Sequence, residues 1–278
     1  MCEDIKTVAL NKALLKFTSK LKLNPLGKIH YGWHSKSAGQ KVIGSTKPFW
    51  IQLSLFESLN MTKSYVKRIE DANNLKGINK PYLYKSFIYQ EDNIFYAILL
   101  SDFVEEPLFT ENSYLIKDID LHPQWLPNLK EQIDIMSQYP TKFISCRQEL
   151  ITRRINERYG DISCQISSWG TIHGDLNWQN VTAITPYLLD WEGWGKGPLG
   201  LDFCFLYCFS LLAPRTANEV KTFFSDYFQS SQGSICLLFV CCELLRMTEI
   251  YKDHENLYEP LKLLGEKIVK NEFDNFQV

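Results

Sequence analysis

The first part of the chain changes from a helical to a strand-like pattern of hydrophobic positions. In residues 1–22 apolar side chains recur at mixed helical spacing with lysines between them, which predicts an amphipathic helix. Three short β-branched and aromatic segments follow at 28–35, 39–44 and 48–56, and Ser35 to Gly39 is the expected turn between the first two. The pattern predicts an antiparallel meander.

A second helix and two more strands follow this meander. Ser64 is a suitable N-cap for a helix over residues 64–75, which has apolar residues along one face. Segments 81–90 and 93–104 are rich in aromatic and β-branched residues, so we expect two further strands there. The part of the chain before residue 107 is therefore predicted to combine a sheet with two helices.

The remainder of the chain is predicted to be mostly helical. Apolar residues at spacings of three and four indicate helices over 128–138, 147–159, 203–213, 217–228, 234–251 and 258–273. Pro214 and Gly233 are the expected breaks among the last four. A β-rich part followed by a helical part predicts an α+β fold, with a small antiparallel sheet in a first lobe and a larger, mostly helical second lobe.

The segment from Thr171 to Asp202 carries the residues that suggest chemistry. A short β-branched run ends in His-Gly-Asp, Asn180 follows five residues after Asp175, and a second β-rich run ends at Asp190. Two carboxylates and an amide are thereby placed at strand ends and in loops. The residues between Asn180 and Asp190 leave room for a tight hairpin, which predicts two short strands.

These residue types suit phosphoryl transfer. A nucleophilic hydroxyl needs a carboxylate within hydrogen-bond reach to orient it and accept its proton, and Asp175 is the candidate for this catalytic role. Mg²⁺ needs a few hard oxygen ligands while it keeps waters and phosphate oxygens, and Asn180 and Asp190 are the candidate metal ligands. Asp202 is expected to stabilise the loop that carries Asp175.

The motifs HGDLNWQN and LLDWEGWGKGPLGLDF resemble the signature of the aminoglycoside phosphotransferase and choline kinase-like superfamily, whose fold is related to the protein kinases. The spacing from Asp175 to Asn180 equals that of the kinase pattern HRDxxxxN, and the triplet at Asp190 stands where kinases have DFG. The resemblance is strong over residues 169–205. It implies a two-lobed protein kinase-like fold and a structural role for His173.

The resemblance also implies that the two lobes have different functions. Residues 1–106 would form a nucleotide-binding lobe, and residues 107–278 a catalytic and acceptor-binding lobe. Mg²⁺ and ATP would be the cofactors. The segment from Ser101 to Pro107 resembles the hinge between the lobes, so Ser101 and Phe103 are candidate contacts for adenine. Such contacts are made by backbone groups, which leaves GTP open as the nucleotide.

The third predicted strand departs from the family pattern. Kinase relatives carry a lysine there that pairs with the nucleotide phosphates and is held by a glutamate of the next helix. This chain has Trp50 and Gln52 instead, and Glu70 falls where the helix glutamate would be. Two explanations remain open. Lys41 on the neighbouring strand replaces the missing charge, or nucleotide binding is weakened or lost and the protein is a pseudokinase.

Several aromatic residues lie close in sequence to the acidic residues, namely Trp178, Trp191, Trp194 and Tyr207. An aromatic box with carboxylates would hold a cationic acceptor, although core packing explains these rings as well. The acceptor is therefore defined only as a hydroxyl compound. An aminoglycoside, an amino alcohol, a sugar and a serine or threonine of a peptide all remain open.

Composition narrows the class of protein further. With 278 residues, 45% of them hydrophobic, the chain can bury a large core. Its net charge of −2 gives no electrostatic argument for a nucleic acid or membrane partner. The eight cysteines include no CxxC pair, which favours reduced thiols in a cytoplasmic protein over disulfides or a zinc site. Neither a signal peptide nor a membrane span is predicted.

Two functions from different classes follow. The first is an Mg²⁺- and ATP-dependent phosphotransferase that acts on a hydroxyl of a small molecule or, as an alternative, of a peptide. The second is a pseudokinase-like binding module that holds a protein partner or a metabolite without turnover. The intact set of Asp175, Asn180 and Asp190 favours the enzyme, whereas Trp50 and Gln52 favour the binding module.

Overall fold

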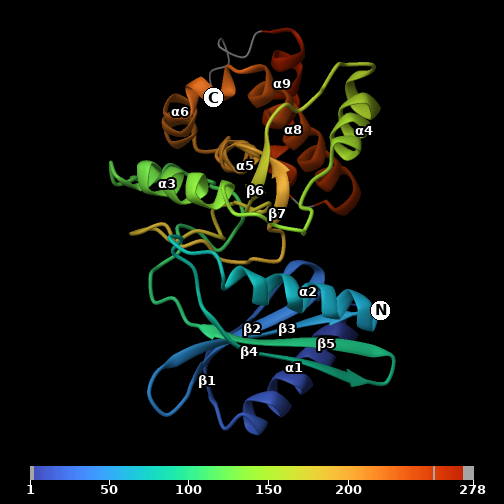
Figure 1. Cartoon of the computed structure of the whole chain (residues 1–278), viewed down its shortest axis with the longest axis vertical. Helices are drawn as coiled ribbons and strands as arrows, with labels where there is room; N and C mark the ends of the chain where they lie inside the picture. Colours follow the sequence, from blue (N-terminus) through green and yellow to red (C-terminus); the bar gives the residue numbers. More distant parts are fainter. Residues whose placement is uncertain (1–2, 253, 272–278) are drawn as a thin grey trace. The chain divides into compact units, whose positions relative to one another are not determined.

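The computed structural model describes residues 3–252 and 254–271, which divide into two compact units (Figure 1). Unit 1 comprises Met1–Lys76 and Lys80–Glu105, and unit 2 comprises Gly77–Asn79 and Glu106–Val278. Unit 1 contains an antiparallel sheet and unit 2 is mostly helical. This arrangement confirms the predicted α+β fold. The assignment of nucleotide binding to one unit and catalysis to the other stays a prediction.

Unit 1 is built on a five-stranded antiparallel sheet in the order β1-β2-β3-β5-β4. The strands are β1 (Asn24–Tyr31), β2 (Ser37–Ile43), β3 (Pro48–Phe56), β4 (Leu83–Glu91) and β5 (Ile94–Asp102). The connection between β1 and β2 is a short turn at Trp33–Ser35, so the turn expected at Ser35 to Gly39 is wrong. Gly39 lies inside β2, where a Cβ would come within 2.6 Å of the Trp50 indole.

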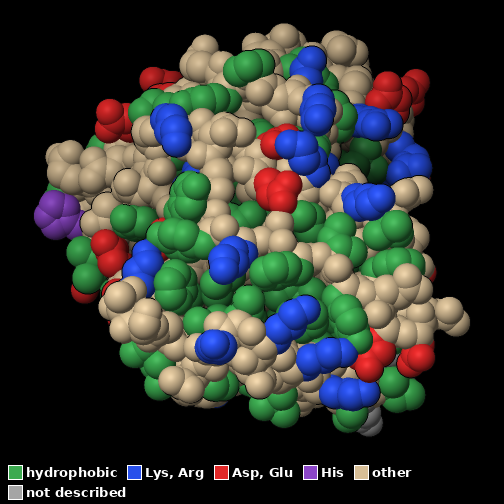
Figure 2. All heavy atoms as spheres, turned by 60° about the horizontal axis from the view of Figure 1, so that its bottom comes forward, with side chains coloured by type: hydrophobic (Ala, Val, Ile, Leu, Met, Phe, Trp, Pro, Cys, Tyr) green, Lys and Arg blue, Asp and Glu red, His purple; other side chains and the backbone are tan. Residues whose placement is uncertain are grey.

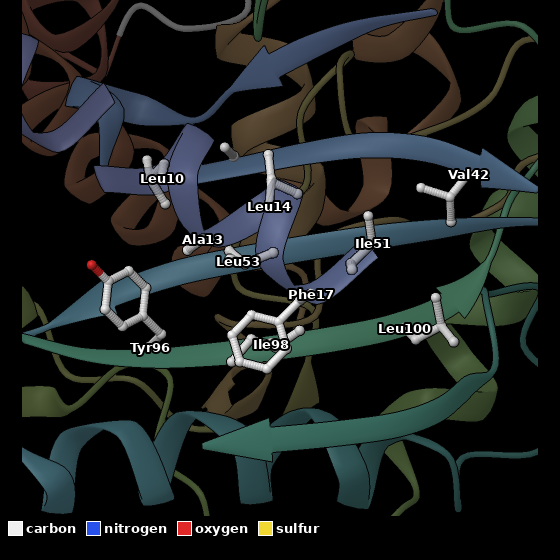
Figure 3. Close-up of a cluster of buried hydrophobic side chains, with 11 residues drawn as sticks. Leu10, Ala13, Leu14, Phe17, Val42, Ile51, Leu53, Tyr96, Ile98 and Leu100 are labelled. Atoms are coloured by element: carbon white, nitrogen blue, oxygen red, sulfur yellow. The ribbon is translucent and has the colours of Figure 1, made fainter. Parts of the chain in front are cut away.

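One helix covers each face of this sheet (Figures 1 and 3). The first, α1 (Glu3–Lys20), buries Leu14 and Phe17 against the face that carries Ile51. The second, α2 (Leu59–Ala72), buries Val66 against the opposite face. Because side chains alternate along a strand, Trp50 and its even-numbered neighbours on β3 face the α2 side.

Helix α2 begins earlier than the sequence predicted. Its N-cap is Ser58, whose hydroxyl accepts a hydrogen bond from the backbone N–H of Met61 at 3.3 Å. Ser64, the expected cap, lies one turn and a half inside the helix. The sequence offers two serines in front of apolar residues at helical spacing, and the chain uses the first because Thr62 and Val66 are then both buried.

Unit 2 consists of helices around a small two-stranded sheet of β6 (Trp169–Ile172) and β7 (Gly195–Pro198). The helices are α3 (Trp125–Ser137), α4 (Gln148–Tyr159), α5 (Leu201–Cys208), α6 (Pro214–Phe223), α7 (Ser225–Phe228), α8 (Ser231–Tyr251) and α9 (Tyr258–Val269). Short 3₁₀ turns occur at Trp33–Ser35 and Glu255–Leu257. The end predicted for the last helix, Phe273, falls outside the described residues.

The two predicted helix breaks have different outcomes. Pro214 is the first residue of α6, where its missing N–H costs no hydrogen bond, so this boundary is confirmed. Gly233 is no break, because it lies in the first turn of α8 and donates its N–H to the capping hydroxyl of Ser230 at 3.0 Å. A glycine is needed there because a Cβ would overlap the backbone of Tyr227.

The cysteines belong to the interior of unit 2. Those in the described part of the chain are buried free thiols, at 146, 164, 204, 208, 236, 241 and 242, whereas Cys2 lies outside that part. Most of them sit on α5 and α8, which pack together. None of the helices that the structure describes is long and apolar enough to cross a membrane.

Candidate active site

The end of β6 leads into a tight turn that packs against a second loop. Gly174 has a left-handed backbone with φ of +80°. A Cβ on this residue would lie 2.6 Å from the carbonyl oxygen of Gly193 and would also overlap the hydroxyl of Ser145. Only glycine meets both conditions, because it tolerates positive φ and has no Cβ. The sequence His-Gly-Asp therefore allows two loops to approach backbone to backbone.

Asp202 holds this turn in place. Its carboxylate accepts hydrogen bonds from the backbone N–H groups of His173, at 2.9 Å, and Gly174, at 2.8 Å. The side chain lies in the first turn of α5 and is fully buried, and burial raises the pKa of its carboxyl to about 6. The loop-stabilising role expected for Asp202 therefore has a direct geometric basis.

His173 connects the same turn to the segment before Asp190. Its Nε2–H donates to the carbonyl of Leu189 at 2.8 Å, and its ring packs edge-on against Trp191 at 5.0 Å. Burial lowers the pKa of the imidazole to about 4, so the ring is neutral near pH 7. A neutral, buried, hydrogen-bonded histidine orients backbone and is poorly suited to acid–base chemistry in this position.

Asp175 is held by two asparagines. One carboxylate oxygen accepts a hydrogen bond from Asn180 Nδ2 at 2.9 Å, and the other accepts from Asn177 Nδ2 at 3.2 Å. Burial, and then the negative charge of Asp190, raise the pKa of Asp175 to about 7. Asn177 was not predicted from the sequence, although an asparagine two residues after an aspartate is a turn signal. Its Oδ1 accepts a hydrogen bond from the backbone N–H of Gln179 at 3.0 Å.

A short hairpin brings Asp190 back to this loop. The backbone N–H of Leu189 donates to the carbonyl of Asn180 at 2.8 Å. Between these residues the structure forms one isolated bridge, Val181 with Leu188, instead of the two short strands that the spacing predicted. Thr182 and Tyr187 close the turn with hydrogen bonds of their own, so little length is left for a ladder.

Asp190 combines an exposed side chain with an unusual backbone. Its φ of +56° lies in the left-handed region, which non-glycine residues adopt mainly where the surrounding structure forces them to, as at functional sites. The residue is exposed to solvent, yet the protein around its carboxyl displaces enough water to raise the pKa. A carboxylate that remains accessible and lies close to a second acid is a suitable cation ligand.

The donor atoms at this site fit a magnesium ion. Asn180 uses its amide nitrogen for Asp175, at 3.0 Å to the backbone oxygen and 2.9 Å to the carboxylate, so its amide oxygen is the atom that a cation would contact. The described part of the chain has no cluster of three or more His, Cys, Asp or Glu side chains that could enclose a metal. Mg²⁺ matches such a set, because it binds through one or two side-chain oxygens together with waters and phosphates.

The aromatic residues near this site are packed inside unit 2. Trp178 and Tyr207 are fully buried, and Trp191 and Trp194 are 5% and 3% exposed. Trp178 stacks on Trp125 at 5.6 Å and donates its indole N–H to Ser210 at 3.0 Å. Rings in such positions cannot line an open box for a cationic acceptor. Core packing is therefore the correct explanation for them.

Three of the candidate nucleotide-binding residues lie around Trp50 in unit 1. Lys41 on β2 and Ser101 on β5 are the cross-strand neighbours of Trp50, so Lys41, Trp50 and Ser101 share one face of the sheet. Lys41 Nζ lies 4.0 Å from the centre of the Phe103 ring and forms an ion pair with Glu105 at 3.2 Å. Lys41 therefore has an acidic partner, Glu105, that was not predicted from the sequence.

Gln52 and Glu70 have other partners. Gln52 Nε2 donates to the hydroxyl of Tyr65 at 3.4 Å, and the same hydroxyl lies 3.1 Å from Ser54. Glu70 accepts a hydrogen bond from the hydroxyl of Ser86 at 2.5 Å. Gln52 and Glu70 therefore do not contact each other but have separate partners within unit 1.

Comparison with known proteins relates the chain to others by structure alone. No family model matches the sequence, and no curated protein matches it. The solved structure of aminoglycoside phosphotransferase APH(4)-Ia matches with a TM-score of 0.60 and 10% identity, over 94% of this chain and 98% of that one.

Two other solved structures show the same similarity. A choline/ethanolamine kinase family protein from Mesorhizobium loti matches with a TM-score of 0.55 and 9% identity, over 91% of this chain and 90% of that one. A macrolide 2′-phosphotransferase of type I matches with a TM-score of 0.53 and 9% identity, over 91% of this chain and 95% of that one. The chain therefore has the kinase-like α+β fold of these solved structures.

Proposed function

We propose that the protein transfers the terminal phosphoryl group of ATP or GTP to a hydroxyl of a small molecule. The observation that carries this proposal is the geometry around Asp175. Its carboxylate is fixed by Asn177 and Asn180, its pKa is raised to about 7, and the accessible carboxylate of Asp190 lies close enough to influence it. The fold, shared with phosphotransferases, supports the same proposal.

In this mechanism Asp175 orients the acceptor hydroxyl and takes up its proton. A base with a pKa near 7 is partly ionised at neutral pH and can still hold a proton, which suits general base catalysis. Asn177 and Asn180 keep the carboxylate in one orientation, because each donates to a different oxygen. The carboxylate is therefore already oriented before the acceptor binds, so less entropy is lost when the reactants are aligned.

Asp190 and the amide oxygen of Asn180 would hold Mg²⁺. When bound, the ion supplies positive charge that offsets the charge of the phosphate oxygens in the transition state. The left-handed backbone at Asp190 and the hydrogen bond from Leu189 to Asn180 set the separation of these two ligands. Asp202 and His173 act one step away, because they fix the loops that carry the ligands.

A thermal-shift titration tests this function. We expect ATP or GTP with Mg²⁺ to raise the unfolding temperature of the purified protein by several degrees, since a ligand at a hundredfold excess over its Kd stabilises the native state by about 2.7 kcal/mol. Asp190→Ala should abolish the part of the shift that requires Mg²⁺. Asp161→Ala, which removes an exposed acid elsewhere in unit 2, is the control.

A shift that depends on Mg²⁺ and is followed by phosphorylation of a hydroxyl compound in an acceptor screen would establish the enzyme. The screen should include aminoglycosides, amino alcohols, sugars and a Ser/Thr peptide. The absence of any shift with either nucleotide would contradict the proposal. That result would favour the binding module, whose supporting observation is that Gln52 is engaged with Tyr65 inside unit 1.

Lys41 is the residue of unit 1 that we propose for binding the nucleotide phosphates. We expect Lys41→Ala to weaken nucleotide binding at least tenfold, because β3 itself contains no lysine that could bind the phosphates. Lys47→Ala is the matched control. Lys47 directly precedes β3 and, like Lys41, forms an ion pair with an acid, Asp102 at 2.8 Å. Equal nucleotide affinity of the two variants by calorimetry would rule out the relocation of the lysine to β2.

A further inference from the structure

The small net charge of the chain conceals two units of opposite charge. Unit 1 contains fifteen Lys and Arg against nine Asp and Glu, a net charge of +6, and unit 2 contains fifteen against twenty-three, a net charge of −8. The positive charge comes mainly from one stretch. Residues 5–56 include nine lysines and no Asp or Glu, and they form most of α1 and the strands β1 to β3.

Helix α1 carries hydrophobic side chains on two faces. Leu10, Leu14 and Phe17 lie in the core of unit 1 (Figure 3). Ile5, Val8 and Leu15 lie on the outer side and are 58%, 67% and 67% exposed. Spacings of three and seven residues align these three side chains along one side of the helix. One apolar face is enough to attach a helix to a sheet, so the fold leaves the second face unexplained.

Lysines border this outer face. Lys12 lies within it, between Val8 and Leu15, and Lys16, Lys20 and Lys22 are exposed towards its C-terminal end. Lys12 is paired with Glu91 at 3.2 Å but remains 71% exposed. Figure 2, which brings the lower part of Figure 1 forward, shows Lys and Arg side chains scattered among hydrophobic ones.

The neighbouring strand extends the same pattern. β1 is an edge strand that packs beside α1, and all but one of its residues are exposed. Tyr31 of β1 and Trp33 in the following turn are 43% and 41% exposed. Tyr31 donates its hydroxyl to Asn11 of α1 at 2.7 Å, so its ring lies beside this helix. Amphipathic aromatic rings, aliphatic side chains and lysines in one surface are the composition typical of proteins that lie on a lipid bilayer.

We propose that the outer face of α1, together with Tyr31 and Trp33 beside it, binds the surface of an anionic phospholipid membrane. The lysines would contact the headgroups, and the aliphatic side chains would enter the boundary with the acyl chains. A nucleic acid would complement the charge equally well, but it offers no apolar layer for Ile5, Val8 and Leu15. The inference is independent of the proposed phosphotransferase activity.

Co-sedimentation of the purified full chain with lipid vesicles tests the proposal. We expect binding to vesicles that contain phosphatidylserine, little binding to vesicles of phosphatidylcholine alone, and weaker binding as salt shortens the screening length. Replacing Lys20 and Lys22 by Ala should weaken binding about fivefold per lysine, which corresponds to about 1 kcal/mol each. Lys262→Ala together with Lys267→Ala, on α9 of unit 2, should leave binding unchanged.

A second pair of variants, one on α1 and a control on α9, tests the contribution of apolar side chains to vesicle binding. Leu15→Gln on α1 should weaken vesicle binding about ten- to a hundredfold, because the side chain no longer gains from leaving water. Leu263→Gln on α9 removes a leucine that is 51% exposed on a helix of unit 2 and should have no effect. Both positions are exposed, so the thermal stability of both variants should match that of the parent chain.

Four outcomes would overturn the proposal. One is equal binding to charged and uncharged vesicles, and another is equal binding by the Leu15 and Leu263 variants. The third is a concentration-dependent dimer that Leu15→Gln converts to a monomer in sedimentation velocity, because the outer face would then serve a second copy of the chain. Tight binding of a labelled RNA without any binding to anionic vesicles would assign the positive charge to a nucleic acid instead.

Discussion

Replacing Asp175 by Asn is expected to lower kcat for phosphoryl transfer by about 10²- to 10⁴-fold while the protein stays folded. The amide matches the shape of the carboxyl but cannot accept the proton of the acceptor hydroxyl. The variant should lose at most about 1–2 kcal/mol of stability: burial favours a neutral group here, as the raised pKa of Asp175 indicates, but the amide can accept only one of the two hydrogen bonds from Asn177 and Asn180. Steady-state kinetics with an acceptor from the screen, together with thermal denaturation, provide the measurement.

The dependence of kcat/KM on pH provides a second test of the role of Asp175 as the base. Asp175 becomes ionised only as the pH rises through its pKa of about 7, so kcat/KM should increase up to that pH and level off above it. Added Mg²⁺ should move this acidic limb to lower pH, since a nearby positive charge favours the ionised carboxylate. The residual activity of Asp175→Asn should lack the limb, whereas Asp161→Asn should retain it. A wild-type rate in Asp175→Asn would exclude this residue as the base.

Replacing Gly174 by Ala is expected to destabilise unit 2 by about 2–5 kcal/mol. A residue with a side chain costs about 1–2 kcal/mol in the left-handed region. The overlap of the new Cβ with the Gly193 carbonyl, 2.6 Å away, adds about 1–3 kcal/mol. Chemical denaturation measures the change in the free energy of unfolding as a shift of the denaturant midpoint, provided that the m-value is the same for both proteins.

Gly160→Ala is the matched control for this substitution. Gly160 has φ of +84°, close to the +80° of Gly174, but no atom lies within 4 Å of the position of a Cβ there. Its ψ of −165° lies in a region that is essentially restricted to glycine, so the variant should lose only the conformational part, about 1–3 kcal/mol. An equal loss in the two variants would mean that the contact between the two loops contributes nothing to stability.

The candidate site was predictable from sequence because its signal is local. Asp175 and Asn180 lie within one loop, and the hydrogen bonds that join them span five residues. The turn between them requires no knowledge of distant parts of the chain. The sheet of unit 1 was predictable for a similar reason, since alternating residues of β3 separate cleanly into a face towards α1 and a face towards α2.

The features that were missed depend on partners far away in sequence. β7 has the sequence Gly-Lys-Gly-Pro, which has low strand propensity, and it forms because it pairs with β6, more than twenty residues earlier. A Cβ on Gly195 would lie 2.9 Å from the backbone of Phe143, so its glycine serves close packing rather than a turn. Such a requirement is invisible in the local pattern.

The partners of the candidate nucleotide-binding residues could not be predicted for the same reason. Glu105 reaches Lys41 across a separation of 64 residues, and the hydroxyl of Tyr65 meets both Gln52 and Ser54. A family pattern assigns roles to positions, but it cannot say which hydrogen bond a substituted residue will make. Gln52 illustrates this limit, since the family pattern does not reveal that its amide donates to the hydroxyl of Tyr65.

The distribution of cysteines allows the opening of unit 2 to be measured separately from that of unit 1. Apart from Cys2, every cysteine belongs to unit 2, and the seven described thiols are all buried. An alkylating reagent can therefore modify these seven only when unit 2 opens. Mass spectrometry after short pulses of such a reagent would follow the opening of unit 2 alone, and nucleotide or Mg²⁺ bound to that unit would slow the modification without any label being introduced.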